Sequence, residues 1–216
     1  MKLPVIVGID SIRGDTSKAY NIVSQLCTRV SGFKIGLPNI LTCKDIGNTV
    51  RRACPDTMIL ADLKLADIGY TMKLVASHVV EWSDAIIAHS FPGVEGGLDE
   101  LKEYLDSRGK KLVLVATMSN PGASKIMDKV LDDVITIIES IKPWGIVAPA
   151  TRTEKIIYLR RRLPDTIILS PGIGAQGAKP GSAISAGANY EIIGRMIAKA
   201  ENPSKVIEEI RPFYHV

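Results

Sequence analysis

Eight short apolar segments recur at nearly even spacing along the 216-residue chain, and each is rich in β-branched residues. They cover residues 4–10, 32–36, 57–64, 84–90, 111–118, 144–150, 166–172 and 190–194. Most of these segments are continuously apolar rather than alternating, which is typical of strands covered on both faces, as in parallel sheets. The pattern therefore predicts eight buried parallel strands.

Helix-like segments separate the predicted strands. Residues 15–30, 98–109 and 128–142 place apolar side chains at helical spacing, and several such segments end at glycine or proline. Regular alternation of strand and helix indicates either a doubly wound sheet or a (β/α)8 barrel. Eight near-equal units, with no GxGxxG motif after the first strand, favour the TIM barrel, with residues 1–216 as one catalytic domain.

Composition narrows the functional classes. The chain is 46% apolar and 23% charged, and its net charge of +4 favours anionic small molecules while being too weak to indicate nucleic acid. The N-terminal apolar run ends at Asp10, so we expect neither a signal peptide nor a membrane span. Cys27, Cys43 and Cys54 contain no C-x-x-C pair, so we expect a cytoplasmic protein with no disulfide and no zinc site.

Polar or small residues stand at the predicted carboxyl ends of most strands. In chain order they are Asp10, Lys34, Asp62, Lys64, Ser119, Gly194 and Arg195. Because a TIM barrel carries its chemistry at the carboxyl ends of its strands, we expect these residues to surround one cavity mouth.

The segments after the last two strands are typical of a phosphate site. "SPGIGAQG" (170–177) supplies small residues whose backbone N–H groups can approach an anion closely. Arg195 follows Gly194 and can direct two donors onto a phosphate. A glycine-rich turn beside a surface arginine is the plainer alternative, but in a TIM barrel both pieces fall where phosphate is usually bound.

Lys34, Asp62, Lys64 and Asp67 could form a row of charges of alternating sign. Opposite neighbours would keep Asp62 ionised and both lysines protonated. Asp62 would then repel a substrate carboxylate, and Lys64 could donate a proton to the carbon that the carboxylate leaves. The alternatives are a buried ion network that only sets the register of the barrel, which is a poor stabiliser, and a Schiff-base lysine, which flanking carboxylates disfavour.

The segment "DLKLADI" (62–68) resembles the D-x-K-x-x-D-I signature of the orotidine 5′-phosphate decarboxylase family in its short microbial and archaeal form. Other matching pieces run through nearly the whole chain: "GID", "FKIG", "MSNPGA", "SPGIGAQG" and "IIGR". The resemblance implies a (β/α)8 barrel that converts orotidine 5′-monophosphate to uridine 5′-monophosphate, the last step of de novo pyrimidine synthesis. It implies no metal and no organic cofactor.

The resemblance also implies a role for each catalytic residue. Lys64 would be the proton donor to C6 of the pyrimidine, and Asp62 would crowd the departing carboxylate. Lys34 and Asp10 would hold ribose hydroxyls and complete the charge network. A homodimer would be the working unit, because three residues would reach into the site of a second subunit: Asp67, Ile68 and Thr71.

The remaining implied substrate contacts come from later in the chain. Ser119 would face the amide edge of the pyrimidine, Gln176 would bridge base and phosphate, and Arg195 would hold the phosphate. The other implied contacts are Pro171, Gly172, Ile173, Gly174 and Gly194. The chain departs from the family pattern, without loss of a proposed catalytic group, at Gly69, Thr117, Asn120, Ala178 and Asn189, and Thr117 stands where Glu is common.

Two other functions compete. A Mg²⁺-dependent keto-sugar-phosphate decarboxylase or hexulose-phosphate synthase resembles this chain at D-x-K-x-x-D, but such enzymes place a metal-binding Glu where this chain has Lys34. A non-catalytic nucleic-acid-binding protein is suggested by Arg160, Arg161 and Arg162. These arginines would splay over more than one helix face, without an aromatic platform, so we expect a solvated helix end and no nucleic-acid or membrane partner.

Overall fold

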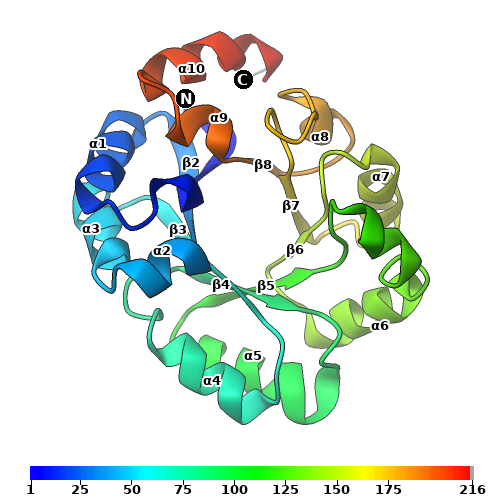
Figure 1. Cartoon of the computed structure of the whole chain (residues 1–216). Coiled ribbons are helices and arrows are strands. Elements are labelled where there is room, and N and C mark those ends of the chain that lie inside the picture. Colours follow the sequence, from blue (N-terminus) through cyan, green and yellow to red (C-terminus); the bar gives the residue numbers. More distant parts are fainter. Residues whose placement is uncertain (215–216) are drawn as a thin grey trace.

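The computed structural model describes residues 1–214, which form a closed barrel of eight parallel strands in chain order (Figure 1). β8 returns to pair with β1 and closes the barrel. The strands are β1 Leu3–Gly8, β2 Val30–Gly36, β3 Met58–Leu65, β4 Ala85–His89, β5 Lys111–Val115, β6 Gly145–Val147, β7 Ile167–Pro171 and β8 Tyr190–Ile193. The predicted TIM barrel is confirmed, and residues 215 and 216 of the predicted domain lie outside the described part.

Helices form the outer ring of the barrel in Figure 1. They are α1 Thr16–Leu26, α2 Leu37–Thr42, α3 Ile46–Ala53, α4 Gly69–Ser77, α5 Asp99–Ser107, α6 Leu131–Ile141, α7 Thr153–Arg162, α8 Ser182–Ser185, α9 Arg195–Ala198 and α10 Pro203–Ile210. Short helical turns add η1 Asp10–Ile12, η2 Val94–Leu98, η3 Pro121–Lys125 and η4 Arg211–Phe213. None of the helices within residues 1–214 is long and apolar enough to span a bilayer.

The continuous apolar strands supply two separate hydrophobic layers. Val5 and Val7 of β1 face the helices, whereas Ile6 between them faces the barrel interior, because successive strand residues point to opposite sides. The interior layer also contains Leu60, Ile87, Val113, Val115, Val147, Leu169 and Ile192. Burial on both faces explains why the strands lack polar alternation, and the interior layer fills the barrel beneath its mouth.

Arg160, at the end of α7, is held inside the fold. Its guanidinium donates hydrogen bonds to Oδ1 of Asn189 and to the backbone carbonyls of Leu163, Pro164, Thr166 and Gly187. Nearby, Arg162 pairs with Asp132 at 3.0 Å. Two of the three consecutive arginines are therefore occupied by contacts within the protein, which removes the basic stripe that a nucleic-acid-binding function would need.

The same arrangement recurs at the end of α3. Arg51 donates to the backbone carbonyls of Pro55, Thr57 and Trp82 and pairs with Asp84 at 2.6 Å. Residues 51–60, "RRACPDTMIL", and 160–169, "RRRLPDTIIL", are identical at seven of ten positions. The two halves of the barrel thus repeat one local sequence together with one hydrogen-bond pattern, which secures the entry into β3 and into β7.

The expectation that the cysteines form no disulfide was wrong. Cys27, directly after α1, and Cys54, directly after α3, are joined by a disulfide with a Cα–Cα distance of 5.7 Å. The two residues are 27 positions apart, so no short motif connects them. They meet because α1 and α3 are neighbours on the outside of the barrel (Figure 1), where the pairing of β1, β2 and β3 brings them together.

Candidate active site

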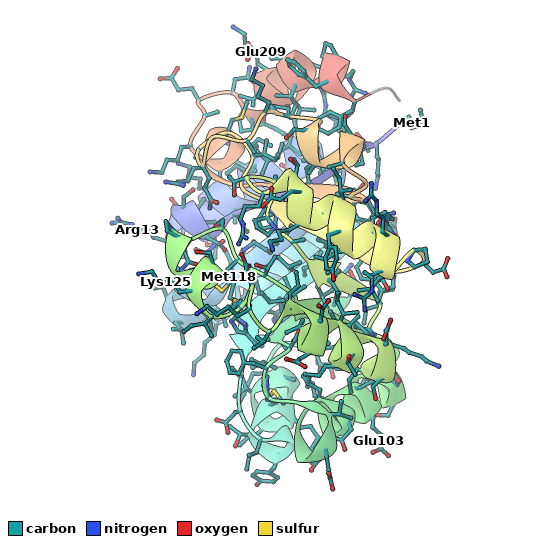
Figure 2. All side chains as sticks on the ribbon, turned by 90° about the vertical axis from the view of Figure 1, so that its right-hand side faces the viewer. Met1, Arg13, Glu103, Met118, Lys125 and Glu209 are labelled. Atoms are coloured by element: carbon teal, nitrogen blue, oxygen red, sulfur yellow. A yellow bond between two sulfur atoms is a disulfide. The ribbon has the colours of Figure 1, made fainter. Side chains whose placement is uncertain are left out.

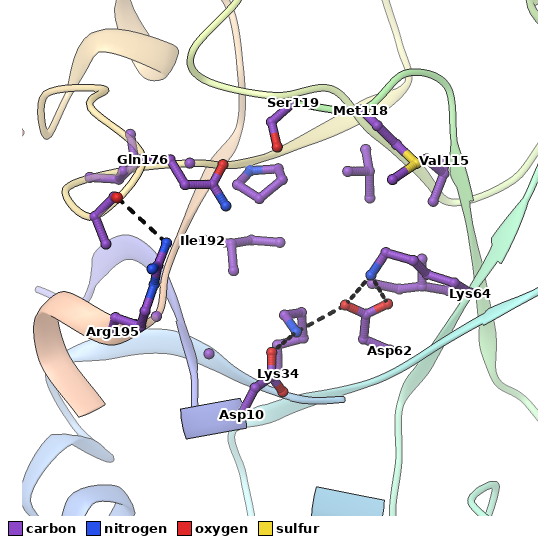
Figure 3. Close-up of a pocket in the computed structure, with 18 of the residues that line it drawn as sticks. Asp10, Lys34, Asp62, Lys64, Val115, Met118, Ser119, Gln176, Ile192 and Arg195 are labelled. Carbon is purple, nitrogen blue, oxygen red and sulfur yellow. Dashed lines mark hydrogen bonds and ion pairs between the residues drawn. The ribbon is translucent and has the colours of Figure 1, made fainter. Parts of the chain in front are cut away.

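The carboxyl ends of the strands surround a cavity of about 420 Å³ at the barrel mouth (Figure 3). This volume suits a small-molecule ligand. Predicted site residues that line it are Asp10, Lys34, Asp62, Lys64, Ser119, Pro171, Gly172, Ile173, Gln176, Gly194 and Arg195. Figure 2, a side view, shows Arg13 and Lys125 projecting on the same side of the barrel as Met118, which also lines the cavity.

A row of four charges of alternating sign lies along one wall of the cavity (Figure 3). Lys34 Nζ is 2.6 Å from Asp10 Oδ2 and 2.9 Å from Asp62 Oδ2. Lys64 Nζ donates to both carboxylate oxygens of Asp62, at 2.8 and 2.7 Å. The side chains of Lys34 and Asp62, in the middle of the row, are 9% and 6% exposed, whereas those of Asp10 and Lys64 at its two ends are 39% and 43% exposed.

The electrostatics of the row keep its two buried members charged. Burial by itself would lower the pKa of Lys34, but the neighbouring carboxylates of Asp62 and Asp10 outweigh it, and the pKa is raised. Burial would likewise raise the pKa of Asp62, but Lys34 and Lys64 outweigh it, and the pKa is lowered. Asp62 is therefore an ionised carboxylate, held rigidly in a nearly dry site.

Asp10 stands at the Lys34 end of the row, whereas the alternating pattern predicted Asp67 at the opposite end, beyond Lys64. β3 ends at Leu65, and Asp67 lies in the turn that follows, exposed, with its Oδ1 accepting the backbone N–H of Ile68. Ile68 is also exposed, Thr71 is half-buried in α4, and none of the three lines the cavity of its own barrel. Asp67 is therefore separated from the row by the path of the chain, and its assignment to a second subunit stays a prediction.

Lys64 reaches Asp62 through an irregular backbone. Asp62 pairs with Ile87 of β4, but the next pairing joins Leu65 to Ala88, so Leu63 and Lys64 form a bulge. Lys64 has a φ of 44°, in the left-handed region that residues with a Cβ rarely adopt. Simple alternation correctly predicted that the two side chains converge, but the bulge is what turns the amine back onto the carboxylate.

The opposite side of the cavity carries the glycine-rich loop and Arg195 (Figure 3). Gly172 and Gly174 have φ of 115° and 72°, which explains glycine at both positions. Arg195 opens α9, and its Nη2 is 3.5 Å from the carbonyl of Ala175 in the same loop. Gly174 packs against Met196 instead of lining the cavity: a Cβ there would lie 2.7 Å from Met196 Sδ.

Sequence reasoning missed the apolar floor of the cavity. Four interior residues form it: Ile87, Val115, Val147 and Ile192. The signal was available, because each is an inward-facing residue within three positions of the end of a predicted strand. These residues were missed because only polar residues at the strand ends had been considered as candidates for lining the cavity. Gly8, Ser11, Thr117, Met118 and Ala175 also line the cavity and had not been assigned to it.

These features define a TIM-barrel enzyme with a charged site at the carboxyl ends of its strands. The family described as "Orotidine 5′-phosphate decarboxylase / HUMPS family" matches residues 3–210. Orotidine 5′-phosphate decarboxylase of Aeropyrum pernix is 43% identical over 213 residues, covering 97% of this chain and 87% of that protein. The Pyrococcus furiosus enzyme of the same name is 44% identical over 203 residues, covering 91% and 93%.

Solved structures agree. Orotidine 5′-monophosphate decarboxylase from Sulfolobus solfataricus has a TM-score of 0.86 at 38% identity, covering 98% of this chain and 97% of that one. The enzyme from Methanocaldococcus jannaschii, complexed with inhibitor BMP, has a TM-score of 0.90 at 27% identity, with full coverage of both chains. The chain therefore belongs to the orotidine 5′-phosphate decarboxylase family. The resemblance found in the sequence and the prediction of a carboxy-lyase are both confirmed.

Proposed function

We propose that the chain decarboxylates orotidine 5′-monophosphate to uridine 5′-monophosphate by means of its own charged side chains, without a metal or organic cofactor. The observation that carries this proposal is the pair Asp62–Lys64. An ionised, 6%-exposed carboxylate accepts two hydrogen bonds from an amine that remains open to the cavity. A repelling acid and a proton donor thus stand side by side.

The chemistry follows from that pair. A substrate carboxylate placed beside Asp62 is repelled by it, and the carbon–carbon bond to C6 breaks with release of CO2. The electron pair stays on C6, where the ammonium of Lys64 stabilises the developing negative charge and then transfers its proton. Lys64 becomes neutral and regains a proton from solvent, so the cycle balances. Lys34 lies between Asp10 and Asp62 and holds the carboxylate of Asp62 in place. Together with Asp10, it also forms hydrogen bonds with the ribose hydroxyls.

We assign substrate binding to the opposite side of the cavity. Arg195 can give two parallel N–H donors to the phosphate, beside the backbone of Gly172, Ile173 and Gly194. Gln176 lies between that region and Ser119 in Figure 3, which suits contacts to both phosphate and base. Pro171 and Ile173 complete this wall. Binding of the remote phosphate can then hold the reacting carboxylate against Asp62.

We further propose a homodimer in which Asp67, Ile68 and Thr71 complete the site of the partner subunit. Ile68, Tyr70 and Leu74 form an exposed, largely apolar surface around the start of α4, which suits burial against a second copy. Mixing Lys64→Ala and Asp67→Ala subunits, each inactive alone, should restore about a quarter of all sites by random exchange. No recovery despite demonstrated exchange would mean that Asp67 serves its own barrel.

The proposed reaction is tested by following the loss of orotidine 5′-monophosphate absorbance in metal-free buffer. We expect turnover with or without EDTA, and loss of that turnover in Lys64→Ala while uridine 5′-monophosphate still binds. Lys125→Ala, at the rim of the mouth, is the matched control and should keep activity. Normal turnover in Lys64→Ala would remove the proposed proton donor.

Inhibition by EDTA would instead favour the Mg²⁺-dependent rival. In that rival the residue at position 34 would be a metal ligand, whereas here the ammonium of Lys34 sits between two carboxylates and would repel a cation. We also propose a cytoplasmic location. A disulfide such as Cys27–Cys54 is compatible with that location in the intracellular proteins of hyperthermophiles.

A further inference from the structure

One ion pair fastens the end of the loop between β5 and α6. Arg152, directly before α7, binds Asp128 with both terminal nitrogens: Nη1 is 3.1 Å from Oδ1, and Nη2 contacts Oδ2. The two side chains are only 17% and 13% exposed. Such a bidentate, largely buried pair fixes both distance and orientation between its partners.

The same ion pair reaches back to the beginning of the loop. Asp128 Oδ1 accepts a hydrogen bond from Thr117 Oγ1 at 3.1 Å, and Thr117 is fully buried. Arg152 Nη1 also lies 3.5 Å from the carbonyl of Met118. Both ends of the segment 117–128 therefore meet at one point, although they are eleven residues apart.

The beginning of this segment forms part of the cavity. Thr117, Met118 and Ser119 line it, and Figure 3 shows Ser119 above the cavity, across from the Asp62–Lys64 pair. Farther along, the backbone N–H of Asp128 donates to the carbonyl of Ala123 at 3.2 Å, which closes the segment into a compact turn. The conformation of Ser119 thus depends on contacts made outside the cavity.

The ion pair is charged at neutral pH. The hydrogen bonds from Arg152, with help from Thr117, hold the pKa of the Asp128 carboxyl below its usual range in spite of partial burial. Lys155, with Nζ 3.6 Å from Asp128 Oδ2, adds a second cation. Removing the charge of Asp128 therefore removes most of what joins the segment to α7.

We propose that Asp128 and Arg152 are positioning residues, which hold the segment 117–128 in the conformation that presents Ser119 to the pyrimidine. The proposal rests on the function assigned to the cavity above. If the segment is released, only a fraction of molecules has Ser119 in place, and the apparent substrate affinity falls by that fraction. The chemistry at Lys64 is untouched, so KM rises while kcat is kept.

The test compares Asp128→Asn with a matched control nearby. Asp132 of α6 pairs with Arg162 of α7 at 3.0 Å, so this ion pair joins the two helices themselves, on the exposed outer surface. We expect Asp128→Asn to raise KM for orotidine 5′-monophosphate about tenfold, with kcat within twofold and a similar weakening of uridine 5′-monophosphate binding. Asp132→Asn should leave KM and nucleotide binding unchanged.

A double-mutant cycle of Asp128→Ala and Arg152→Ala shows whether the two residues act together, with thermal midpoints recorded for all variants. We expect the double variant to raise KM no more than either single variant. Additive effects on KM, an unchanged KM in Asp128→Asn, or a loss confined to kcat would each overturn the proposal. Nucleotide binding is measured independently of turnover, so an inactive wild-type chain would count against the proposed reaction and not against the positioning role.

Discussion

The left-handed backbone at Lys64 allows a direct test of how this site is built. Lys64→Ala and Lys64→Gly both remove the ammonium and its bonds to Asp62, so the lost ion pair cancels when the two variants are compared. They differ in how easily they adopt a φ of 44°. We therefore expect the glycine variant to be more stable than the alanine variant, the reverse of the usual order inside a strand or helix.

The size of the difference follows from two opposing terms. For a residue with a Cβ, the left-handed conformation costs about 1–2 kcal/mol of conformational free energy, and glycine avoids most of this cost. In the opposite direction, glycine is less favourable than alanine by about 0.5–1 kcal/mol, because it loses more backbone conformational entropy when the chain folds. The glycine variant should thus be more stable by about 0.5–1 kcal/mol, or roughly 1–4 °C in thermal midpoint for a chain of this length.

The assay is reversible denaturant unfolding of the two variants, backed by thermal melts. Lys142, which ends α6 at a φ of 51°, is the positive control: glycine should again be the more stable residue there, without loss of activity. Lys102, inside α5, is the opposite control, because glycine there should cost about 1 kcal/mol relative to alanine.

An alanine variant at position 64 as stable as the glycine variant, with both controls behaving as expected, would refute the reasoning. It would mean that the bulge in β3 relaxes once the amine is gone. The left-handed conformation would then be a consequence of the Lys64–Asp62 bond, and not a feature that the barrel imposes.

Three further predictions concern charge, cross-linking and packing. The pKa of Asp62 is lowered in the folded state. The ionised carboxylate of Asp62 therefore stabilises the folded protein at pH values above its unfolded pKa of about 3.9, and this stabilisation is lost as the pH falls through the pKa of Asp62 in the folded state. The difference in unfolding free energy between wild type and Asp62→Asn should therefore shrink below about pH 4; a constant difference would contradict this. Reduction of Cys27–Cys54, 27 residues apart, should lower stability by up to about 3.5 kcal/mol, and Cys54→Ala should be insensitive to the reductant. Arg160→Ala should lower the unfolding free energy by about 2 kcal/mol without changing kcat, since it leaves several buried carbonyls unpaired, whereas Arg161→Ala should have little effect.

Some of the site could be predicted residue by residue because it depends on local order along the chain. Lys34 and Asp62 stand in the carboxyl-terminal part of a strand, Asp10 and Arg195 just after one, and in a parallel barrel all such ends meet at one mouth. Strand periodicity and topology together therefore place them around the cavity without any knowledge of side-chain conformations. The apolar floor followed from the same rule and was missed only because polar residues alone were considered.

Other features depend on which segments meet, and no local pattern reports this. Asp10 joins the row at Lys34 because β1 lies beside β2, while the chain beyond β3 turns outward and takes Asp67 away from the row of its own barrel. Cys27 and Cys54 bond because α1 packs on α3.

The sequence by itself determined that eight buried strands alternate with helices, that charges and a glycine-rich loop stand at their carboxyl ends, and to which family the chain belongs. Only the tertiary structure decided the order of the charge row, the left-handed turn at Lys64, the disulfide and the Asp128–Arg152 pair. The physical reason is one of range. Apolar periodicity and turn chemistry act within a few residues, whereas these contacts depend on the pairing of neighbouring strands or on the bulge in β3 to bring the residues within bonding distance.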